Sequence, residues 1–325
     1  MRADVLHGVP RLEAEWWDLW SRDPRATVFQ SPAWLIPWRE AFDEGESLVL
    51  AVRDGERLMA LLPLFRYEGR LIPWGAGTTD RLDGIFDPTL DPAMLAQALD
   101  RLSEPVELFQ VEENSLLRRI PLPEGWEERS GTAEPCLELP LPAALSRNMA
   151  QNLRYYRRRA ERAGVAEPER GGPAAFEDLV DLHGRRWQSR GLPGVLHDPR
   201  VLAWHRRTLP ALDAAGLLRL YVLRRGRRAV AVLYGLMAKE RAFYYLGGFD
   251  PELESLGLGT VLIGHAVEEA QREGATVFDF LRGREAYKYR WGAGERTMYA
   301  RRLAPVSCVA ARLAAPSLRN GESAQ

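Results

Sequence analysis

The sequence predicts a mixed α/β fold in two parts, each a twisted, mainly antiparallel sheet flanked by helices. The chain has 325 residues, which is more than one hydrophobic core usually organises. Two separate runs of three consecutive strand-like segments occur, near residues 47–75 and 217–248, and helical patterns precede each run. We therefore expect two halves of the same fold, packed to leave a cleft between them.

The first half begins with a tryptophan-rich amphipathic segment at residues 12–20. A second helix is expected where Ser31 precedes Pro32, since a serine N-cap is often followed by proline in the first turn. Asp54 and Gly55 form a hairpin signal between two strand-like runs. The remaining elements expected in this half are strands at 47–53, 57–67, 71–75, 106–110 and 136–139, and a helix around 92–102.

The second half begins with a long helical run from Ser146 to Gly164, in which apolar residues recur at three- and four-residue spacing. Arginines occupy much of the remaining surface of this helix, at positions 147, 154, 157, 158, 159 and 162. The pattern is typical of a polyanion-binding surface, but a solvated face of a linker helix would look the same. Further elements are expected at 165–168 (strand), 176–189 and 199–214 (helices), 217–224, 228–238 and 241–248 (strands), 258–272 (helix), 276–281 and 297–303 (strands).

The composition excludes several classes of protein. With 46% hydrophobic and 27% charged residues the chain is typical of a soluble globular protein. The formal net charge of −1 gives no overall attraction to nucleic acid or to an anionic membrane. The N-terminus has no secretory pattern and no apolar run is long enough to span a membrane, so we expect a cytoplasmic protein. Cys136 and Cys308 are too far apart to indicate a metal site.

The most informative segment covers residues 278–292, where a hydrophobic strand leads directly into ionisable side chains. Only Lys239 and Lys288 among the 44 basic residues are lysines. A lysine is a compact point charge, whereas arginine is a planar fork that never loses its proton. The ammonium group at position 288 therefore indicates a specific role, with a residual surface lysine as the alternative.

A second informative segment is the turn that contains Gly257 and Gly259, between a strand and a helix. Without side chains at these positions, backbone N–H groups can approach a phosphate at the helix N-terminus. Glu254 places an anion three residues before the first glycine. Either this side chain points to solvent or the turn does not hold a pyrophosphate.

These segments resemble the GNAT superfamily of N-acetyltransferases, and in particular its cellulose-biosynthesis-associated (CelD/BcsL-type) branch, which is related to the Fem-type tandem-domain transferases. The resemblance covers nearly the whole chain. The segments that carry it are 29–34 (FQSPAW), 79–83 (TDRLD), 182–187 (LHGRRW), 248–251 (GFDP), 255–259 (SLGLG) and 279–288 (DFLRGREAYK).

The resemblance implies a tandem enzyme that moves an acetyl or other acyl group from acyl-CoA to an amine or hydroxyl of a small-molecule, sugar or peptide acceptor, without a metal, in polysaccharide biosynthesis. The implied domains are residues 1–140 and 141–305, followed by a tail at 306–325. The implied catalytic residues are Tyr287, Lys288, Glu285, Asp279 and Asp80. Those implied to bind acyl-CoA are Ser255, Gly257, Leu258, Gly259 and Thr260, and those implied to bind the acceptor are Asp83, Trp187 and Arg282.

Direct acyl transfer needs a neutral amine, a polarised carbonyl and a proton for the leaving thiolate. By resemblance Tyr287 supplies that proton, with Tyr289 as the alternative. The base is one of the four carboxylates Asp80, Asp83, Glu285 and Asp279. Asp279 alternates with apolar neighbours and should face the opposite side of the sheet, while Glu285 could instead pair with Lys288 to hold the loop.

Two other functions remain open. A Fem-type aminoacyl-tRNA-dependent transferase would use the arginine helix to bind RNA phosphates. A binding protein with a degenerate transferase fold would carry out no catalysis.

Overall fold

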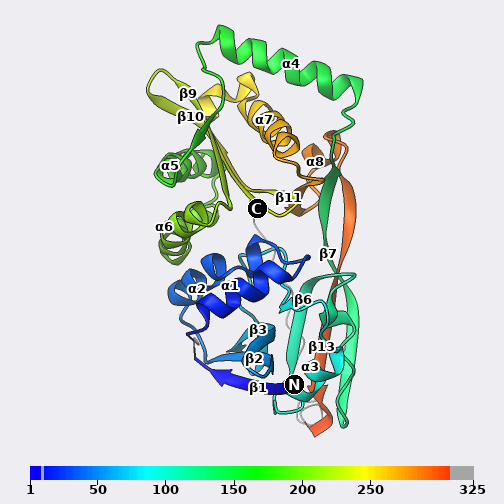
Figure 1. Cartoon of the computed structure of the whole chain (residues 1–325). Coiled ribbons are helices and arrows are strands. Elements are labelled where there is room, and N and C mark those ends of the chain that lie inside the picture. The colour runs from blue at the N-terminus through cyan, green and yellow to red at the C-terminus, as the bar shows by residue number, and fades with distance from the viewer. Residues whose placement is uncertain (9–10, 308–325) are drawn as a thin grey trace. The chain divides into compact units, whose positions relative to one another are not determined.

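The computed structural model describes residues 1–8 and 11–307 (Figure 1). Its strands are mostly antiparallel and are flanked by helices, which confirms the predicted mixed α/β fold. The chain divides into two compact units. Unit 1 comprises Met1–Glu134 together with the described residues from Thr297 onward, and unit 2 comprises Pro135–Arg296.

Both units follow the same order of elements: a strand, two helices, a three-strand meander, a helix and a further strand. Unit 1 contains β1 (Arg2–His7), α1 (Glu13–Arg22), α2 (Pro32–Ala41), β2 (Ser47–Asp54), β3 (Arg57–Tyr67), β4 (Arg70–Pro73), the short β5 (Ile85–Phe86), α3 (Pro92–Leu99) and β6 (Val106–Glu112). Unit 2 contains α4 (Arg147–Arg162), β8 (Glu169–Gly171), α5 (Ala175–Gln188), α6 (Pro199–Ala214), β9 (Leu218–Arg225), β10 (Arg228–Ala238), β11 (Arg241–Phe249), α7 (Leu258–Arg272), β12 (Val277–Arg282) and α8 (Ala286–Arg290).

Each unit is completed by a strand from the other half of the sequence. Residues 298–303 of β13 (Gly294–Pro305) pair antiparallel with β6, and residues 136–140 of β7 (Trp126–Pro140) pair antiparallel with β12. In the strand order, β13 and β7 are also neighbours. The sequence pattern revealed only the buried end of β7, since the preceding residues of that strand are mostly exposed.

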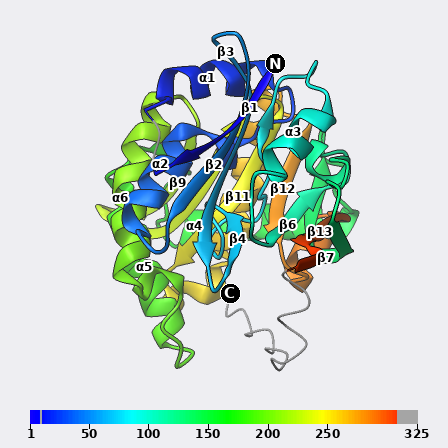
Figure 2. The ribbon, with the colours of Figure 1, turned by 90° about the horizontal axis from the view of Figure 1, so that it is seen from below.

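The strands of unit 2 are covered on both faces. In Figure 1, α5 and α6 lie on one side of β9, β10 and β11, and α7 lies on the other; Figure 2 shows α5 and α6 side by side. Alternate residues of a strand point to opposite faces. Accordingly, Leu233 packs in the core with α7, whereas the ring of Tyr234 contacts Phe176 of α5 and His205 of α6.

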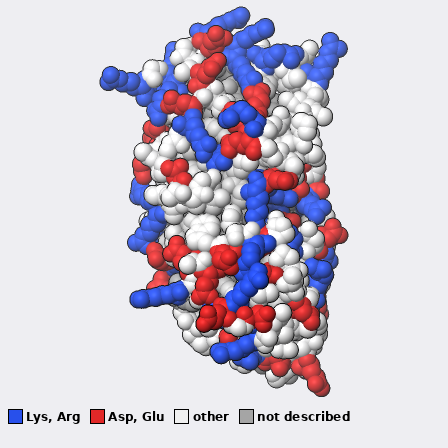
Figure 3. All heavy atoms as spheres, in the orientation of Figure 1, with Lys and Arg blue, Asp and Glu red and all other residues white. Residues whose placement is uncertain are grey.

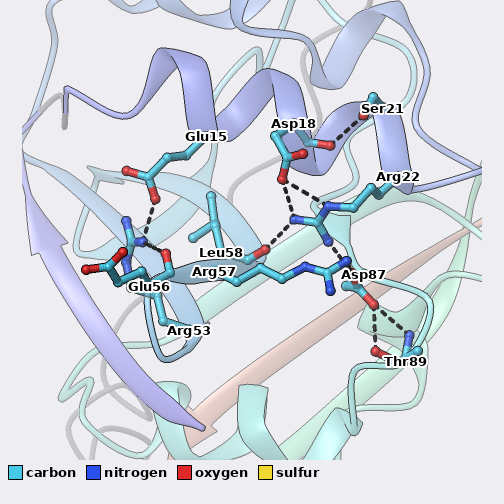
Figure 4. Close-up of polar contacts among 10 residues, drawn as sticks. All are labelled: Glu15, Asp18, Ser21, Arg22, Arg53, Glu56, Arg57, Leu58, Asp87 and Thr89. Atoms are coloured by element: carbon cyan, nitrogen blue, oxygen red, sulfur yellow. Dashed lines mark hydrogen bonds and ion pairs between the residues drawn. The ribbon is translucent and has the colours of Figure 1, made fainter.

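A polar network in unit 1 joins α1 to the loop after β5 (Figure 4). Arg22 donates hydrogen bonds to Asp87 and, at 2.9 Å, to Asp18, while Arg57 reaches Asp87 at 3.1 Å. Burial raises the pKa of Asp87, but hydrogen bonds from Thr89 and the two arginines hold that pKa below its usual value. The charged side chains of this network therefore have a structural role, which is to hold α1 against the loop after β5.

The sequence missed β1, β5 and α8, and placed β8 at 165–168 instead of Glu169–Gly171. Cys136 is buried, whereas Cys308 lies outside the described residues.

Candidate functional site

The candidate site in unit 2 begins where β11 and β12 separate. The two strands pair in parallel only from Arg241 to Phe243 and from Val277 to Asp279, although both continue beyond that point. The pairing of β11 with β10 also shifts register, so that Tyr245 is an extra residue in β11. A bulge beside a separation of strands leaves backbone N–H and C=O groups without ladder partners, which makes them available to a ligand.

Three aromatic rings lie at this separation. The ring of Tyr287 lies 6.4 Å from that of Tyr244 and 6.2 Å from that of Phe280, measured between centroids. Burial, followed by the nearby Tyr244 and Glu285, raises the pKa of Tyr287 well above its usual value, whereas Arg186 lowers it. No described residue hydrogen-bonds to the Tyr287 hydroxyl. This hydroxyl is therefore protonated at neutral pH and available as a proton donor.

Arg186 of α5 belongs to this cluster, although the sequence analysis did not single it out. Its guanidinium lies 4.5 Å from the centre of the Phe249 ring. Burial lowers its pKa, while Tyr244, Tyr287 and Glu254 raise it. The Nε atom is buried and has no hydrogen-bond partner among the described residues. The only sequence signal was its place in the segment LHGRRW.

Lys288 is 2% exposed, and its ammonium group is held by the loop that precedes it. Nζ donates to the carbonyl oxygen of Arg282 at 2.6 Å, and those of Leu281 and Gly283 lie at 3.4 Å. Nζ also lies 2.8 Å from a carboxylate oxygen of the half-buried Glu285. With these acceptors around it, Lys288 is placed to fix the loop rather than to contact an anionic substrate.

Asp279 is completely buried within β12. Its Oδ1 accepts a hydrogen bond from the N–H of Leu281 at 2.8 Å, and its Oδ2 lies 3.4 Å from Arg241. Leu281 has a positive φ of 61°, so the Asp279 carboxylate stabilises a strained turn of the strand. Arg282 follows and is half-buried opposite Cys136 of β7. This geometry supports a structural role for Asp279.

Two other aromatic residues of the predicted site differ from Tyr287: Tyr289, the alternative proton donor, and Trp187, which is implied to bind the acceptor. Tyr289 is 40% exposed, and its hydroxyl donates to Glu295 at 2.6 Å. Trp187 is buried, where its ring packs near His183 and the backbone of Gly194. No described contact joins either side chain to Tyr244, Phe280 or Tyr287 at the separation of β11 and β12.

The glycine turn precedes α7. Gly257 is the N-cap with φ +64°, and no side chain caps the helix. A Cβ at Gly257 would come within 2.4 Å of the ring of Tyr156, so α4 closes over this turn. Glu254 and Ser255 are exposed and Leu258 is buried. Thr260 bonds through its backbone N–H to Gly257 at 2.9 Å.

The arginines of α4 form an exposed basic surface, seen as the blue side chains at the top of Figure 3, where Figure 1 places α4. The residues that line its hollow are Gln151, Arg154, Tyr155, Arg158, Arg159 and Arg162. The opposite side of the helix buries Met149, Leu153 and Ala160. Arg157 instead pairs with Glu268 of α7 at 2.6 Å.

Asp80 and Asp83 lie in unit 1, in the segment between β4 and β5. Asp80 is buried, and Asp83 is partly buried and accepts hydrogen bonds from Ser115 and from the N–H of Gly84. The participation of these two carboxylates in a reaction stays a prediction. Among the described residues, no three His, Cys, Asp or Glu side chains form a possible metal site, and no helix there is both long and apolar enough to cross a membrane.

Comparison with known proteins gives one family match. Residues 147–289 match the family model described as "Acetyltransferase (GNAT) domain". No curated protein matches the sequence.

Solved structures show the same fold over most of the chain. The structure of FemX superposes with a TM-score of 0.65 at 11% identity, covering 96% of this chain and 99% of that one. A conserved protein of unknown function from Bacteroides thetaiotaomicron VPI-5482 gives 0.64 at 17% identity, covering 93% and 100%. L-PGS from Bacillus licheniformis gives 0.57 at 15% identity, covering 82% and 86%. The CelD/BcsL branch stays a prediction.

Proposed function

We propose that this chain is an acyl-CoA-dependent N-acyltransferase whose reaction centre lies in unit 2, where β11 and β12 separate. The observation that carries the proposal is the Tyr287 hydroxyl, which is protonated, has no hydrogen-bond partner among the described residues, and lies beside Tyr244 and Arg186. The match of residues 147–289 to a GNAT domain supports the same reaction class.

The residues present fit an acyl-CoA. Its pyrophosphate suits the uncapped N-terminus of α7, where Gly257 and Gly259 leave the backbone accessible and the helix adds favourable partial charge. Ser255, Leu258 and Thr260 complete this turn. The edge of β11 beyond Phe243 offers backbone groups to the amides of an extended pantetheine arm, as an added strand would use them.

A thioester supplies an acyl carbon that an amine can attack directly. Backbone N–H groups at the bulge of β11 polarise the thioester carbonyl, and Tyr287 donates its proton to the sulfur as the C–S bond breaks. Glu285 is a carboxylate whose charge raises the pKa of this proton donor, and it accepts, through water, the proton that the amine loses. The buried Nε of Arg186 binds an oxygen of the acceptor. Lys288 and Asp279 hold the loop and strand that position these groups.

Calorimetric titration of the full chain tests this proposal. Acetyl-CoA and a longer acyl-CoA should each bind saturably, and thiol release should begin when primary amines are added. The resemblance directs the choice of acceptors to sugar amines and peptide amines, with hydroxyl acceptors included. The proposal fails if neither donor binds, and donor binding without turnover across these acceptors would favour a binding protein.

An aminoacyl-tRNA-dependent transfer is the second candidate, because α4 presents an exposed row of arginines. Replacing Arg154, Arg158 and Arg162 by Gln should then weaken tRNA binding and reduce the slope of affinity against salt concentration, since phosphate contacts release counterions. Unchanged tRNA affinity in this variant, measured beside acetyl-CoA affinity, would exclude a role of α4 in RNA binding.

A further inference from the structure

A small polar pocket lies within unit 1, apart from the cluster around Tyr287. It holds about 10 Å³, which is space for one water-sized group. All of its lining residues belong to unit 1, and nearly all are polar. They are Asp23, Arg25, Thr27, Gln30, Arg81, Asp83, Gly84, Gln110, Glu112 and Asn114.

Gln110 is the first sign that this pocket takes a ligand. The residue is 3% exposed, yet neither its amide oxygen nor its amide nitrogen has a hydrogen-bond partner among the described residues. Its positive φ of 53° lies near the end of β6, where the pairing with β13 shifts register. A buried amide without partners is costly, so the amide indicates a group that is bound there.

Asp83 is the second sign. Its two hydrogen bonds, from Ser115 Oγ and Gly84 N, both reach Oδ1 at 2.8 Å, and no described side chain forms an ion pair with it. The other two carboxylates of the pocket are already bonded: Asp23 accepts from the N–H groups of Arg25 and Phe86, and Glu112 from Arg81. Oδ2 of Asp83 is therefore an acceptor to which no described residue donates a hydrogen bond.

We propose that this pocket binds the ammonium group of a small primary amine, with Asp83 Oδ2 and Gln110 Oε1 as its acceptors. An ammonium group is close to water in size, donates hydrogen bonds only, and compensates a carboxylate that forms no ion pair with a described side chain. The Gln110 amide nitrogen is left to donate to a hydroxyl on the second carbon from the amine nitrogen. An amino alcohol satisfies both amide atoms. The site does not depend on the reaction proposed for unit 2.

The affinity should depend on pH through Asp83. Burial raises the pKa of this carboxyl to about 7, with Glu112 and Asp23 raising it and Ser115 and Arg25 lowering it. An ammonium ion binds the ionised carboxylate, so its affinity rises from pH 6 to pH 8. A neutral ligand shows no such increase.

Three probe molecules distinguish an ammonium ligand from a neutral one: ethanolamine, ethylamine and ethanol. Each is titrated into the isotope-labelled full chain and followed by NMR. We expect both amines to bind, with ethanolamine the tighter, and ethanol to leave the spectrum unchanged. Asp83→Asn keeps the shape of the side chain and should weaken ethanolamine binding at least tenfold. Gln110→Met should weaken ethanolamine more than ethylamine. Asp91→Asn, the same change at an exposed helix cap, should have no effect.

Each variant is checked for folding by circular dichroism, and the pH dependence of the unchanged protein needs no variant. The proposal is overturned if ethanol binds as well as ethylamine, if neither amine shifts any signal, or if ethanolamine affinity is the same at pH 6 and pH 8. Any of these results leaves an ordered water as the occupant of the pocket.

Discussion

The ammonium nitrogen of Lys288 lies 2.8 Å from a carboxylate oxygen of Glu285, three residues earlier in the chain. The same nitrogen is 2.6 Å from the carbonyl oxygen of Arg282. A compact ammonium can sit among carbonyls and a carboxylate in this small space, whereas a planar guanidinium cannot. The geometry therefore explains why a chain so rich in arginine has a lysine at this position, and it fixes the loop from which Tyr287 projects.

Replacing Lys288 by Met should destabilise the fold by about 1–3 kcal/mol, the cost of leaving the buried carbonyl oxygens around Nζ without their hydrogen-bond donor. Lys288→Arg should also destabilise, because the larger head group does not fit among the three carbonyls. Urea denaturation measures both effects. Lys239→Met, at the other lysine, which is exposed, is the control. Equal midpoints for the Lys288 and Lys239 variants would contradict the buried role.

Replacing Tyr287 by Phe should lower turnover by about 10²–10⁴, the contribution of a positioned general acid. Acetyl-CoA affinity should stay the same, because the ring that packs against Phe280 is retained. Thiol release and calorimetry measure the two quantities. Tyr289→Phe removes an exposed hydroxyl that bonds to Glu295 and should keep full turnover. Equal rates for the two variants would remove Tyr287 from the mechanism.

Local patterns predicted many elements because their signals are local. The strand at 228–238 and the helices at 199–214 and 258–272 are found as expected. In α6, Asp198 caps the first turn and Pro199 occupies its first position. The exchange of β7 and β13 could not be predicted, since strand partners far apart in sequence leave no mark on local periodicity. The exposed first part of β7 had no apolar alternation to reveal it.

The candidate site was predicted in part. The segment that contains Tyr287 was identified because ionisable residues follow a buried strand. The surroundings of Lys288 could not be predicted, because sequence cannot show that backbone carbonyls surround an ammonium, and its catalytic role stays a prediction. Arg186 was missed for a related reason: in an arginine-rich chain, only the fold shows which guanidinium is buried beside Tyr244 and Tyr287.

Gly257→Ala should weaken acetyl-CoA binding and lower stability by about 1 kcal/mol. The new Cβ adopts an unfavourable positive φ and meets the ring of Tyr156, which must move away from the turn. Gly216 has a similar φ of 70°, and a Cβ added there would have no atom within 4 Å. Gly216→Ala therefore carries only the backbone cost of a side chain at positive φ. Calorimetry and urea denaturation compare the two. If both variants bind acetyl-CoA with unchanged affinity, the α7 turn does not hold the donor.

Asp83 should make the folded protein less stable as the pH rises. Its pKa is raised from 3.8 to about 7 in the folded state, so between these values the folded chain binds a proton that the unfolded chain has lost. Stability contributed by this proton is present below about pH 4 and is lost as the pH rises through 7. The loss has an upper bound of about 4 kcal/mol.

Asp83→Asn isolates this effect because every other titrating group, including Asp87 with its lowered pKa, is shared by the two chains. Urea midpoints measured from pH 5 to pH 8 should fall more steeply for the unchanged protein than for the Asn variant. The variant should therefore gain relative stability towards pH 8. Ethanolamine should restore stability to the unchanged protein at pH 8 by binding the ionised carboxylate. Parallel curves for the two chains would show that Asp83 titrates as an ordinary exposed carboxyl.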